Sequence, residues 1–410
     1  MELKIAQTDA PVQRQQTGTV VVPSPSALAV SYHHSGNVLW AVSTGLSLII
    51  PGLLLLTGVS ARLRRLAHSI GRRWLLTVAT YAVLFTVVTA LLTLPLTYYE
   101  EYVRQHAYGL SNQTLSRWLG SWLKGVAVSG LGLALVLWIP YLLLRRSPRR
   151  WWLYAGLATV PLATLVLVVT PIWVDPLFND FGPMKDKALE ARILSLAQRA
   201  GIDGSRVYEV DKSVDTRTVN AYVTGLGGTK RIVFWDTILD RLEPDQVVFV
   251  AAHEMGHFVL RHTFIFIFGA AALITVSLYA VHCVAGTMIV RFSHRFGFTG
   301  LSDVASFPLL LLLGGIVSLI LVPALLALSR YQEHEADRFA LELTRNNHAA
   351  ATTFVRLQEE NLAVPRPGPL YMFWRGSHPT LGDRVDFANH YRPWDTKEPL
   401  RYDRLMRPAE

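Results

Sequence analysis

Two histidines and a glutamate within one apolar segment could bind and use a metal ion. The segment at residues 247–260 reads VVFVAAHEMGHFVL, in which His253 and His257 are four residues apart and Glu254 follows the first histidine. On a helix both imidazoles lie on one face, where they can bind one zinc ion, and the adjacent carboxylate can take a proton from a metal-activated water. Burying these polar groups in an apolar helix is costly unless a cation compensates them. The pattern therefore predicts one Zn²⁺ ion, with His253 and His257 as ligands and Glu254 as the catalytic base.

A third protein ligand must come from farther along the chain. In metzincin proteases a glycine and a third histidine follow the HExxH motif at fixed spacing, but Leu260 and Thr263 occupy those positions here. Two long apolar runs, at residues 264–290 and 307–328, come after the motif. As a pair of membrane crossings they form a hairpin, which returns the chain to the side of the motif at residues 329–337.

The returning segment reads SRYQEHEAD and offers several carboxylates. On a helix Arg330, Glu333 and Asp337 share one face, whereas Glu335 points away from it. We therefore predict that Glu333 is the third zinc ligand. Asp337, one turn farther on, is suited to accept the free N–H of a ligating imidazole and so to fix its tautomer.

The elements that must position these residues include membrane helices. Of the 410 residues, 51% are hydrophobic and only 17% are charged, and the mean hydropathy is +0.30, which is too apolar for an ordinary soluble enzyme. A helix needs about 20 apolar residues to cross a bilayer. Six runs reach that length, at about residues 38–59, 74–97, 122–144, 152–174, 264–290 and 307–328. We predict a mostly α, multi-pass integral membrane protein with about six transmembrane helices.

Two extramembrane pieces remain, and together they predict a small α+β catalytic portion similar to the zincins. The first contains a helix ending at Gly201 and β-rich runs at residues 206–211, 219–224 and 231–235, the last two of which flank residues 225–229 as in a hairpin. The predicted organisation is a flexible tail at 1–35, transmembrane helices 1–4 at 36–178, an α+β segment with the HExxH helix at 179–262, transmembrane helices 5–6 at 263–329, and a C-terminal catalytic portion with the third ligand at 330–410.

Several segments resemble the M48 zinc metallopeptidases, and within them the type I CAAX prenyl protease branch. The resemblance covers about residues 90–390. The matching segments are LPLTYYEEYVRQHAYGLSNQT at 94–114, PIWVDPLFNDF at 171–181, VNAYVTG at 219–225, KRIVFWDTIL at 230–239, AAHEMGHFVLRHT at 251–263, SRYQEHEADRFA at 329–340 and SHPTLGDR at 377–384.

The resemblance implies the same zinc ligands and base, and it adds two groups of residues. It implies that His378 and Arg384 stabilise the oxyanion of peptide hydrolysis, and that Asn220, Ala221 and Tyr222 form an edge strand that pairs with the substrate backbone. From the residues alone, a loop cap at His378 and a turn at Asn220 would be the preferred interpretations. His262 also matches the family, but a histidine at a helix end is usually structural, and we assign it no role.

The implied substrate is a peptide or protein, and its class stays open. Prenylated C-termini, unmodified membrane proteins and exported peptides are all compatible with the residues. The net charge of +9 comes from arginine clusters between apolar runs, as in membrane proteins, and no nucleic-acid recognition motif accompanies it, so nucleic acid is not expected as a partner. A transporter or channel that uses the His/Glu cluster as an ion site is the alternative function. It leaves the β-rich segment and the placement of Glu333 unexplained.

The arginine distribution also predicts a topology. The loops at residues 60–73, 145–151 and 291–304 carry eleven arginines, whereas the loop at 98–121 has only Arg104 and Arg117. The positive-inside rule places the first three loops in the cytoplasm. Counting six crossings then places the zinc site on the extracytoplasmic face. Eukaryotic members of the branch, as the resemblance implies, have seven spans and suggest the opposite side.

Overall fold

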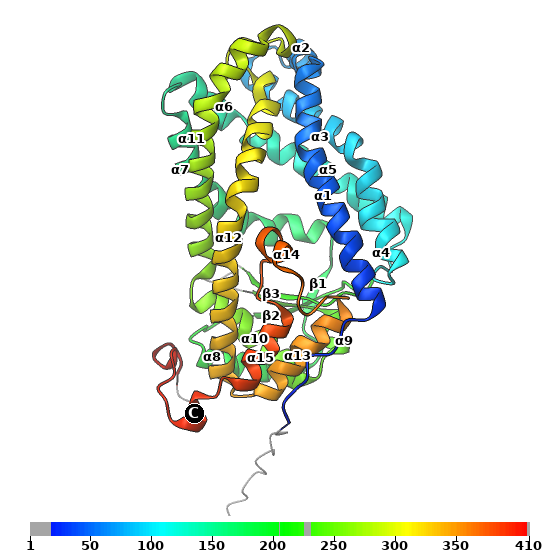
Figure 1. The fold of residues 1–410 in the computed structure, drawn as a ribbon, viewed down its shortest axis with the longest axis vertical. Coiled ribbons are helices and arrows are strands. Elements are labelled where there is room, and N and C mark those ends of the chain that lie inside the picture. The colour runs from blue at the N-terminus through cyan, green and yellow to red at the C-terminus, as the bar shows by residue number, and fades with distance from the viewer. Residues whose placement is uncertain (1–17, 205, 225–230, 408–410) are drawn as a thin grey trace, which may run out of the picture.

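Six long apolar helices form the larger part of the molecule. The computed structural model describes residues 18–204, 206–224 and 231–407. Within them the helices long and apolar enough to cross a membrane are Ala27–Leu56, Trp74–Ala107, Leu115–Arg146, Trp151–Leu177, His262–Phe296 and Val304–Thr344, which confirms the six predicted spans. They run along the long axis, and the strands lie at one end together with the short helices α8 (Lys187–Arg199), α9 (Asp236–Arg241), α13 (Asn347–Glu360) and α15 (Leu381–His390) (Figure 1).

The helical elements have the following bounds. They are α1 Ala27–Leu56, α2 Val59–Gly71, α3 Trp74–Tyr98, α4 Arg104–Ala107, α5 Leu115–Val136, α6 Trp138–Arg146, α7 Trp151–Val169, α8 Lys187–Arg199, α9 Asp236–Arg241, α10 Pro244–Val259, α11 His262–Phe296, α12 Phe307–Thr344, α13 Asn347–Glu360, α14 Pro369–Trp374, α15 Leu381–His390 and α16 Pro393–Thr396.

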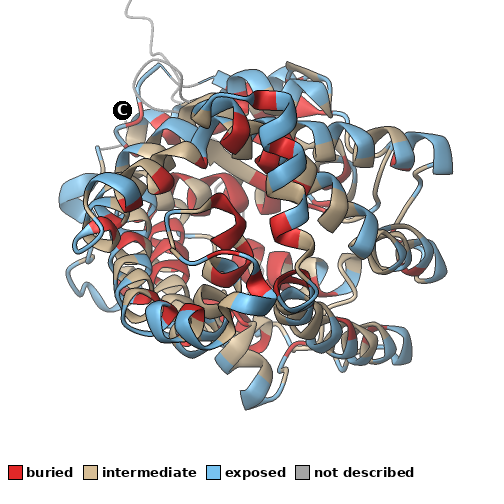
Figure 2. Cartoon of the chain, turned by 90° about the horizontal axis from the view of Figure 1, so that it is seen from above, coloured by how far each residue is buried: buried red, intermediate tan, exposed pale blue. Residues whose placement is uncertain are grey.

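The outer faces of the long helices are apolar. Large hydrophobic side chains such as Leu135, Leu157, Val166 and Ile320 are between 60% and 73% exposed. Seen from above, buried positions gather toward the middle and exposed positions line the periphery (Figure 2). Exposed apolar side chains on backbone that is fully hydrogen-bonded within helices are what a bilayer requires of its spanning segments.

The arginine-rich loops lie together at the end opposite the sheet. Arg64 of α2 forms an ion pair with Asp303 at 2.8 Å, and the Ser60 hydroxyl donates to the Ala305 carbonyl at 2.6 Å. The Arg145 guanidinium lies over the Trp74 ring, 4.9 Å from its centroid. These contacts join the three loops that the sequence analysis assigned to one side of the membrane.

The N-terminal boundary differs from the prediction. The predicted flexible tail reaches residue 35, but α1 begins at Ala27, with the Ser26 hydroxyl capping it by accepting the Ala29 N–H at 3.1 Å. The polar side chains that made residues 27–35 read as a tail lie on the first turns of the helix. The preceding segment packs on the catalytic end, where the Val20 N–H donates to Asn389 Oδ1 at 3.1 Å. Residues 1–17 of the predicted tail lie outside the described residues.

A four-stranded sheet supports the catalytic end. The strands are β1 Phe181–Pro183, β2 Arg206–Val210, β3 Ala221–Thr224 and β4 Arg231–Trp235, in the order β1-β2-β4-β3. β2 and β4 are parallel, whereas β3 is antiparallel to β4, as a hairpin requires; its connection, residues 225–230, lies outside the described residues. The predicted β-rich runs become β2, β3 and β4, and the three-residue β1 was not predicted. Among the described strands β3 is an edge strand.

The helix with the HExxH motif packs closely against α12. A methyl group at Gly256 of α10 would lie 3.2 Å from Ala336 Cα and 3.2 Å from Phe339 Cδ1, a distance that leaves almost no room for a side chain. The residue between Met255 and His257 is therefore small because the two backbones meet there. Since α12 continues from the membrane to Thr344, this contact sets residues 329–340 directly against the motif.

Candidate metal centre

Three side chains on α10 and α12 converge on one point. His253 Nε2 lies 3.1 Å from His257 Nε2 and 3.2 Å from Glu333 Oε2, and Glu333 Oε1 lies 3.4 Å from His257 Nε2. One donor atom from each of the three residues lies within 4.8 Å of the others. Glu333 Oε2 is buried and has no hydrogen-bond partner. Two imidazole nitrogens and a carboxylate oxygen are typical zinc ligands, and a divalent cation among them would satisfy that oxygen.

The surroundings favour a positive charge beside His253. Burial lowers the pKa of this imidazole, but the adjacent carboxylates of Asp337 and Glu333 outweigh the burial and raise the pKa to about 10. The two carboxylates therefore stabilise a cation at this position. Because a proton and a metal ion compete for the same nitrogen, metal affinity is expected to fall as the pH falls.

Each histidine has a partner on its second ring nitrogen. His253 Nδ1 lies 2.8 Å from Asp337 Oδ1, and His257 Nδ1 lies 3.0 Å from His262 Nδ1. The sequence indicates no role for His262, yet this histidine is buried against the motif. The left-handed backbone at Arg261, with φ of 57°, ends α10 and starts α11 so that His262 turns back toward His257.

Arg384 lies behind His253 and is held by Asp337. Its Nε donates to Asp337 Oδ2 at 2.8 Å and its Nη2 to Asp337 Oδ1 at 2.6 Å, a bidentate pair in which both side chains are buried. The same Nη2 is 3.5 Å from His253 Nδ1. Planar bidentate pairing fixes the orientation of a carboxylate, so α15 holds the carboxylate of α12 that contacts the histidine of α10.

His378 approaches the three donors from the loop before α15. Its Nε2 lies 3.3 Å from Glu333 Oε1, and its side chain is 54% exposed. The Ser377 hydroxyl is 2.8 Å from its other ring nitrogen. This imidazole is the accessible member of the cluster, in contrast to the buried Arg384.

Glu254 lies between the edge strand and two cavities. The Val223 N–H of β3 hydrogen-bonds to its carboxylate, and burial raises its pKa, although His253 and His257 oppose that rise. One cavity, of about 160 Å³, is lined by Glu254 with Asn220, Ala221, His253, His378 and Arg384 among others. The other, of about 440 Å³, is lined by Glu254 with Val223, Thr224 and His257 among others. The strand β3 thus runs past Glu254 from one cavity to the other.

The predicted residue Tyr222 is placed differently from its neighbours. Alternation along β3 directs Ala221 and Val223 to one face and Tyr222 to the other, and the Tyr222 side chain lines neither cavity. Burial and the charge of Asp175 raise its pKa to about 12. In the antiparallel register of β3 and β4, the hydrogen bond from the Trp235 N–H to the Asn220 carbonyl also turns the backbone of Tyr222 toward β4, and leaves that of Ala221 and Val223 at the free edge.

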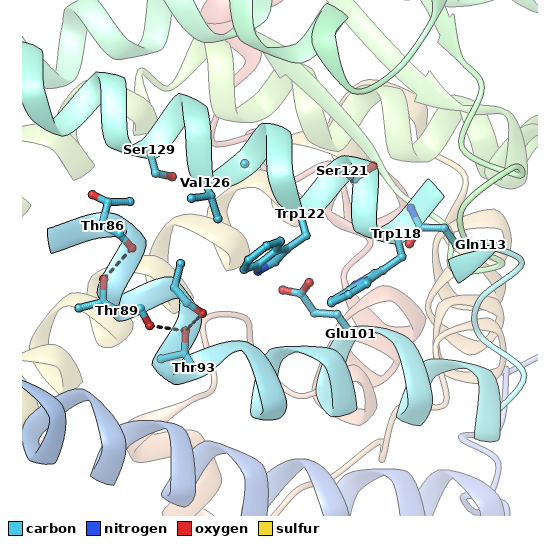
Figure 3. Close-up of a pocket in the computed structure, with 12 residues that line it drawn as sticks. Thr86, Thr89, Thr93, Glu101, Gln113, Trp118, Ser121, Trp122, Val126 and Ser129 are labelled. Carbon is cyan, nitrogen blue, oxygen red and sulfur yellow. Dashed lines mark hydrogen bonds between the residues drawn. The ribbon is translucent and has the colours of Figure 1, made fainter. Parts of the chain in front are cut away.

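A third cavity lies inside the membrane portion, between α3 and α5. It has a volume of about 620 Å³ and is lined by Thr86, Thr89 and Thr93 of α3 and by Ser121 and Ser129 of α5. Glu101 points between the Trp118 and Trp122 rings (Figure 3), and it is the one ionisable side chain in that lining. A single carboxylate without imidazoles is not a metal site, so the cluster on α10 and α12 is the candidate reaction centre.

Comparisons with known proteins agree with this assignment. The family model described as "Peptidase family M48" matches residues 183–392, and the model described as "CAAX prenyl protease N-terminal, five membrane helices" matches residues 27–180. Within the latter range the described residues contain four candidate spans. The match to the peptidase model, at residues 183–392, includes every residue of the candidate centre.

Proteins with similar sequences are named as metalloproteases or CAAX prenyl proteases. The "Uncharacterized metalloprotease YhfN" of Bacillus subtilis is 37% identical over 367 residues, covering 89% of this chain and 86% of the relative. The "CAAX prenyl protease 1 homolog" of Dictyostelium discoideum is 30% identical over 317 residues, covering 73% and 70%. The crystal structure of S. mikatae Ste24p has a similar fold, with a TM-score of 0.74 and 23% identity over 87% of each chain.

The contact between His262 and His257 can be tested by substitution. We expect His262→Ala to weaken divalent-metal affinity by about tenfold or more, because loss of a partner to a ligating imidazole has effects of that size. The measurement is competition with a chelator of known affinity, on the purified full-length protein. His294→Ala, an exposed histidine near the other end of α11, is the control. Equal affinities for the two variants would contradict a role of His262 at the metal centre.

Proposed function

The chain belongs to peptidase family M48, and we propose that His253, His257 and Glu333 hold the zinc ion on which this family depends, with Glu254 as the general base. The protein is a multi-pass integral membrane metalloendopeptidase. The single observation that carries the proposed ligand set is the convergence of those three side chains. Membership of a peptidase family, together with this site beside a sheet edge, leaves the transporter alternative unsupported.

The proposed chemistry is hydrolysis of a peptide bond. When bound, zinc supplies a Lewis acid for the scissile carbonyl and for the attacking water. Glu254 would take the proton of that water and return it to the leaving amine. Burial of Glu254 raises its pKa, which makes it a better proton carrier near neutral pH than an exposed carboxylate would be.

We propose that the substrate backbone pairs with the free edge of β3. Support comes from the place of β3 at the sheet edge and from the two cavities that meet at Glu254. An extended peptide added to this edge would have its side chains directed alternately into and away from the cavities. Ala221 would pair beside Glu254, next to His253, whereas the Asn220 carbonyl already accepts the Trp235 N–H and its side chain accepts the Ala221 N–H.

His378 and Arg384 would then have different roles. His378 is accessible and lies beside Glu333, so it is suited to donate to the oxyanion. Arg384 is bound to Asp337 by two hydrogen bonds. We therefore propose that Arg384 positions Asp337 and His253 and that it is not the main donor to the oxyanion. This division refines the sequence-based expectation that both stabilise the oxyanion.

Replacing Glu254 separates metal binding from proton transfer. Glu254→Gln should retain one zinc ion per chain and lose at least about a hundredfold in kcat, since a positioned general base contributes that much or more. Metal analysis of the purified variant and peptide cleavage measure the two quantities, and Glu359→Gln, an exposed glutamate of α13, is the control. Turnover within twofold of the wild type would show that another group is the base.

We propose that the substrate is a CAAX-type C-terminal peptide that carries a prenyl group. The proposal rests on relatives named "CAAX prenyl protease 1" and on a site that lies at the end of six apolar helices, where a lipid-bearing substrate would arrive from the bilayer.

A pair of peptides tests this substrate class. With the purified, zinc-loaded protein we expect kcat/KM for a farnesylated C-terminal peptide to exceed that for its unprenylated twin by at least about tenfold, because burial of the isoprenoid chain contributes apolar binding free energy. Equal cleavage, or cleavage of the unprenylated twin only, would contradict prenyl recognition and point to unmodified membrane or exported substrates.

We also propose that the metal centre faces the extracytoplasmic side. The support is the arginine-rich set of loops at the opposite end, which the positive-inside rule assigns to the cytoplasm. In a Cys283→Ala background, cysteines at exposed Ser69 of α2 and exposed Thr396 of α16 can be labelled with a membrane-impermeant maleimide on intact cells. We expect labelling of Thr396→Cys before lysis and of Ser69→Cys only after lysis. The reverse pattern would place the metal centre in the cytoplasm.

A further inference from the structure

Two arginines from distant parts of the chain meet beside Gly36 of α1. A methyl group at Gly36 would lie 3.1 Å from Arg104 Nη2 of α4 and 3.9 Å from Arg375 Nη2, which follows α14. Both guanidinium groups therefore occupy one small region against the α1 backbone. The absence of a side chain at Gly36 leaves the space that they use.

Neither arginine has a carboxylate partner within the described part of the chain. Arg104 is 6% exposed and donates to the Tyr32 carbonyl at 2.7 Å and to the Ser35 hydroxyl at 3.0 Å. Arg375 donates to Asn37 Oδ1. All these partners are neutral, whereas Arg384, Arg241 and Arg338 at the catalytic end pair with acids. Two neighbouring cations without a counterion form a site for one anionic group.

An apolar cavity opens next to this pair. It has a volume of about 770 Å³, lies among α1, α12 and α14, and includes Arg375 in its lining. Its other lining residues are mainly apolar or aromatic: Trp40, Ala41, Leu319, Ile320, Leu370 and Phe373 are among them. Several of these are open to the surroundings, with Leu370 74% and Ile320 73% exposed. The cavity thus has a cationic end and an apolar body.

The position along α1 matches a membrane boundary. Gly36 directly precedes the apolar run that starts near residue 38, and aromatic rings surround the arginines, with Arg104 3.7 Å from the Tyr32 ring centroid and Arg375 4.9 Å from that of Tyr371. Tyrosine and tryptophan are enriched where helices leave the bilayer. Lipid phosphates lie at this depth.

We propose that this site binds one anionic phospholipid, with its phosphate between Arg104 and Arg375 and an acyl chain in the cavity. A lipid fits better than a peptide because the walls are helices, whose backbone groups are already bonded within the helix. Trp374 Nε1 is also committed, as it donates to the Leu319 carbonyl at 3.2 Å. An extended peptide would find no backbone partner there, whereas a lipid needs only the cations and the apolar wall.

The bound lipid would also hold in place the loop that carries His378 of the candidate centre, a consequence that rests on the proposed function. Arg330 Nη1 donates to the Met372 carbonyl at 2.8 Å and to the Gly376 carbonyl at 2.7 Å. Arg330 is one turn before Glu333 on α12, and His378 follows Gly376 by two residues. The loop that carries His378 is therefore fixed between the lipid site and the metal centre.

Native mass spectrometry of the purified full-length protein tests the lipid site. The probe is a mixture of phosphatidylglycerol and phosphatidylcholine, and we expect retention of one phosphatidylglycerol with a preference of about tenfold, as for a charge-assisted contact. Arg375→Gln should abolish the preference. Ala41→Phe, which narrows the cavity and leaves both arginines in place, should reduce retention of the lipid, and it keeps the test valid if an arginine variant folds poorly.

Arg145→Gln is the matched control, because Arg145 also lies over a tryptophan ring at a membrane end but belongs to the arginine-rich loops at the other end of the molecule and does not line this cavity. Equal loss of retention in Arg145→Gln and Arg375→Gln, or no loss in either, would overturn the proposal. A second pattern would also overturn it. In that pattern, Arg375→Gln retains lipid unchanged and loses cleavage of peptides with a free C-terminus, but still cleaves amidated peptides. The arginines would then bind a substrate carboxylate. Lipid retention is read without turnover, so its failure is distinguishable from failure of the proposed peptidase site.

Discussion

The close approach of α10 to α12 at Gly256 is the contact on which the site depends. The HExxH motif supplies two imidazoles and a carboxylate from one helix, but a third ligand has to arrive from a helix that begins on the far side of the membrane domain. With no side chain at Gly256, the backbones meet within van der Waals distance, and Glu333 comes into contact with both histidines. Even a methyl group at this position would make the neighbouring atoms of α12 give way by a few tenths of an ångström.

The buried charges at this contact explain why the cluster is built as it is. Glu333 and Asp337 bring two negative charges into the interior, and Arg384 returns one positive charge through its pair with Asp337. The remaining negative charge, the unpartnered Glu333 oxygen and the imidazole nitrogens are the groups that a divalent cation would balance. His262 and Asp337 orient the imidazoles from behind, so the chain supplies both ligands and their supports. The membrane helices hold the two ends of this arrangement, because α12 is one continuous element from the bilayer to the site.

Much of the architecture could be predicted from local patterns. The six spans follow from apolar runs, and the motif spacing with the helical face of Glu333 and Asp337 brings together the residues that the structure places in contact. What could not be predicted depends on long-range packing or on one backbone angle. His262 reaches His257 only because Arg261 adopts a left-handed conformation, and Arg384 meets Asp337 through the fold of α15. The start of α1 was missed because its polar first turns, including Tyr32 and Ser35, contact Arg104, which lies far away in the sequence. The arginine pair beside Gly36 joins three distant segments and leaves no local signal.

The most direct test of the central claim, that α10 and α12 together form one zinc centre, is X-ray absorption spectroscopy of the zinc-loaded, full-length protein. We expect a coordination shell of nitrogen and oxygen donors at about 2.0–2.2 Å with two imidazole contributions, and loss of one oxygen donor in Glu333→Ala with both imidazoles retained. A spectrum with sulfur from Cys283, or a wild-type first shell in Glu333→Ala, would contradict it.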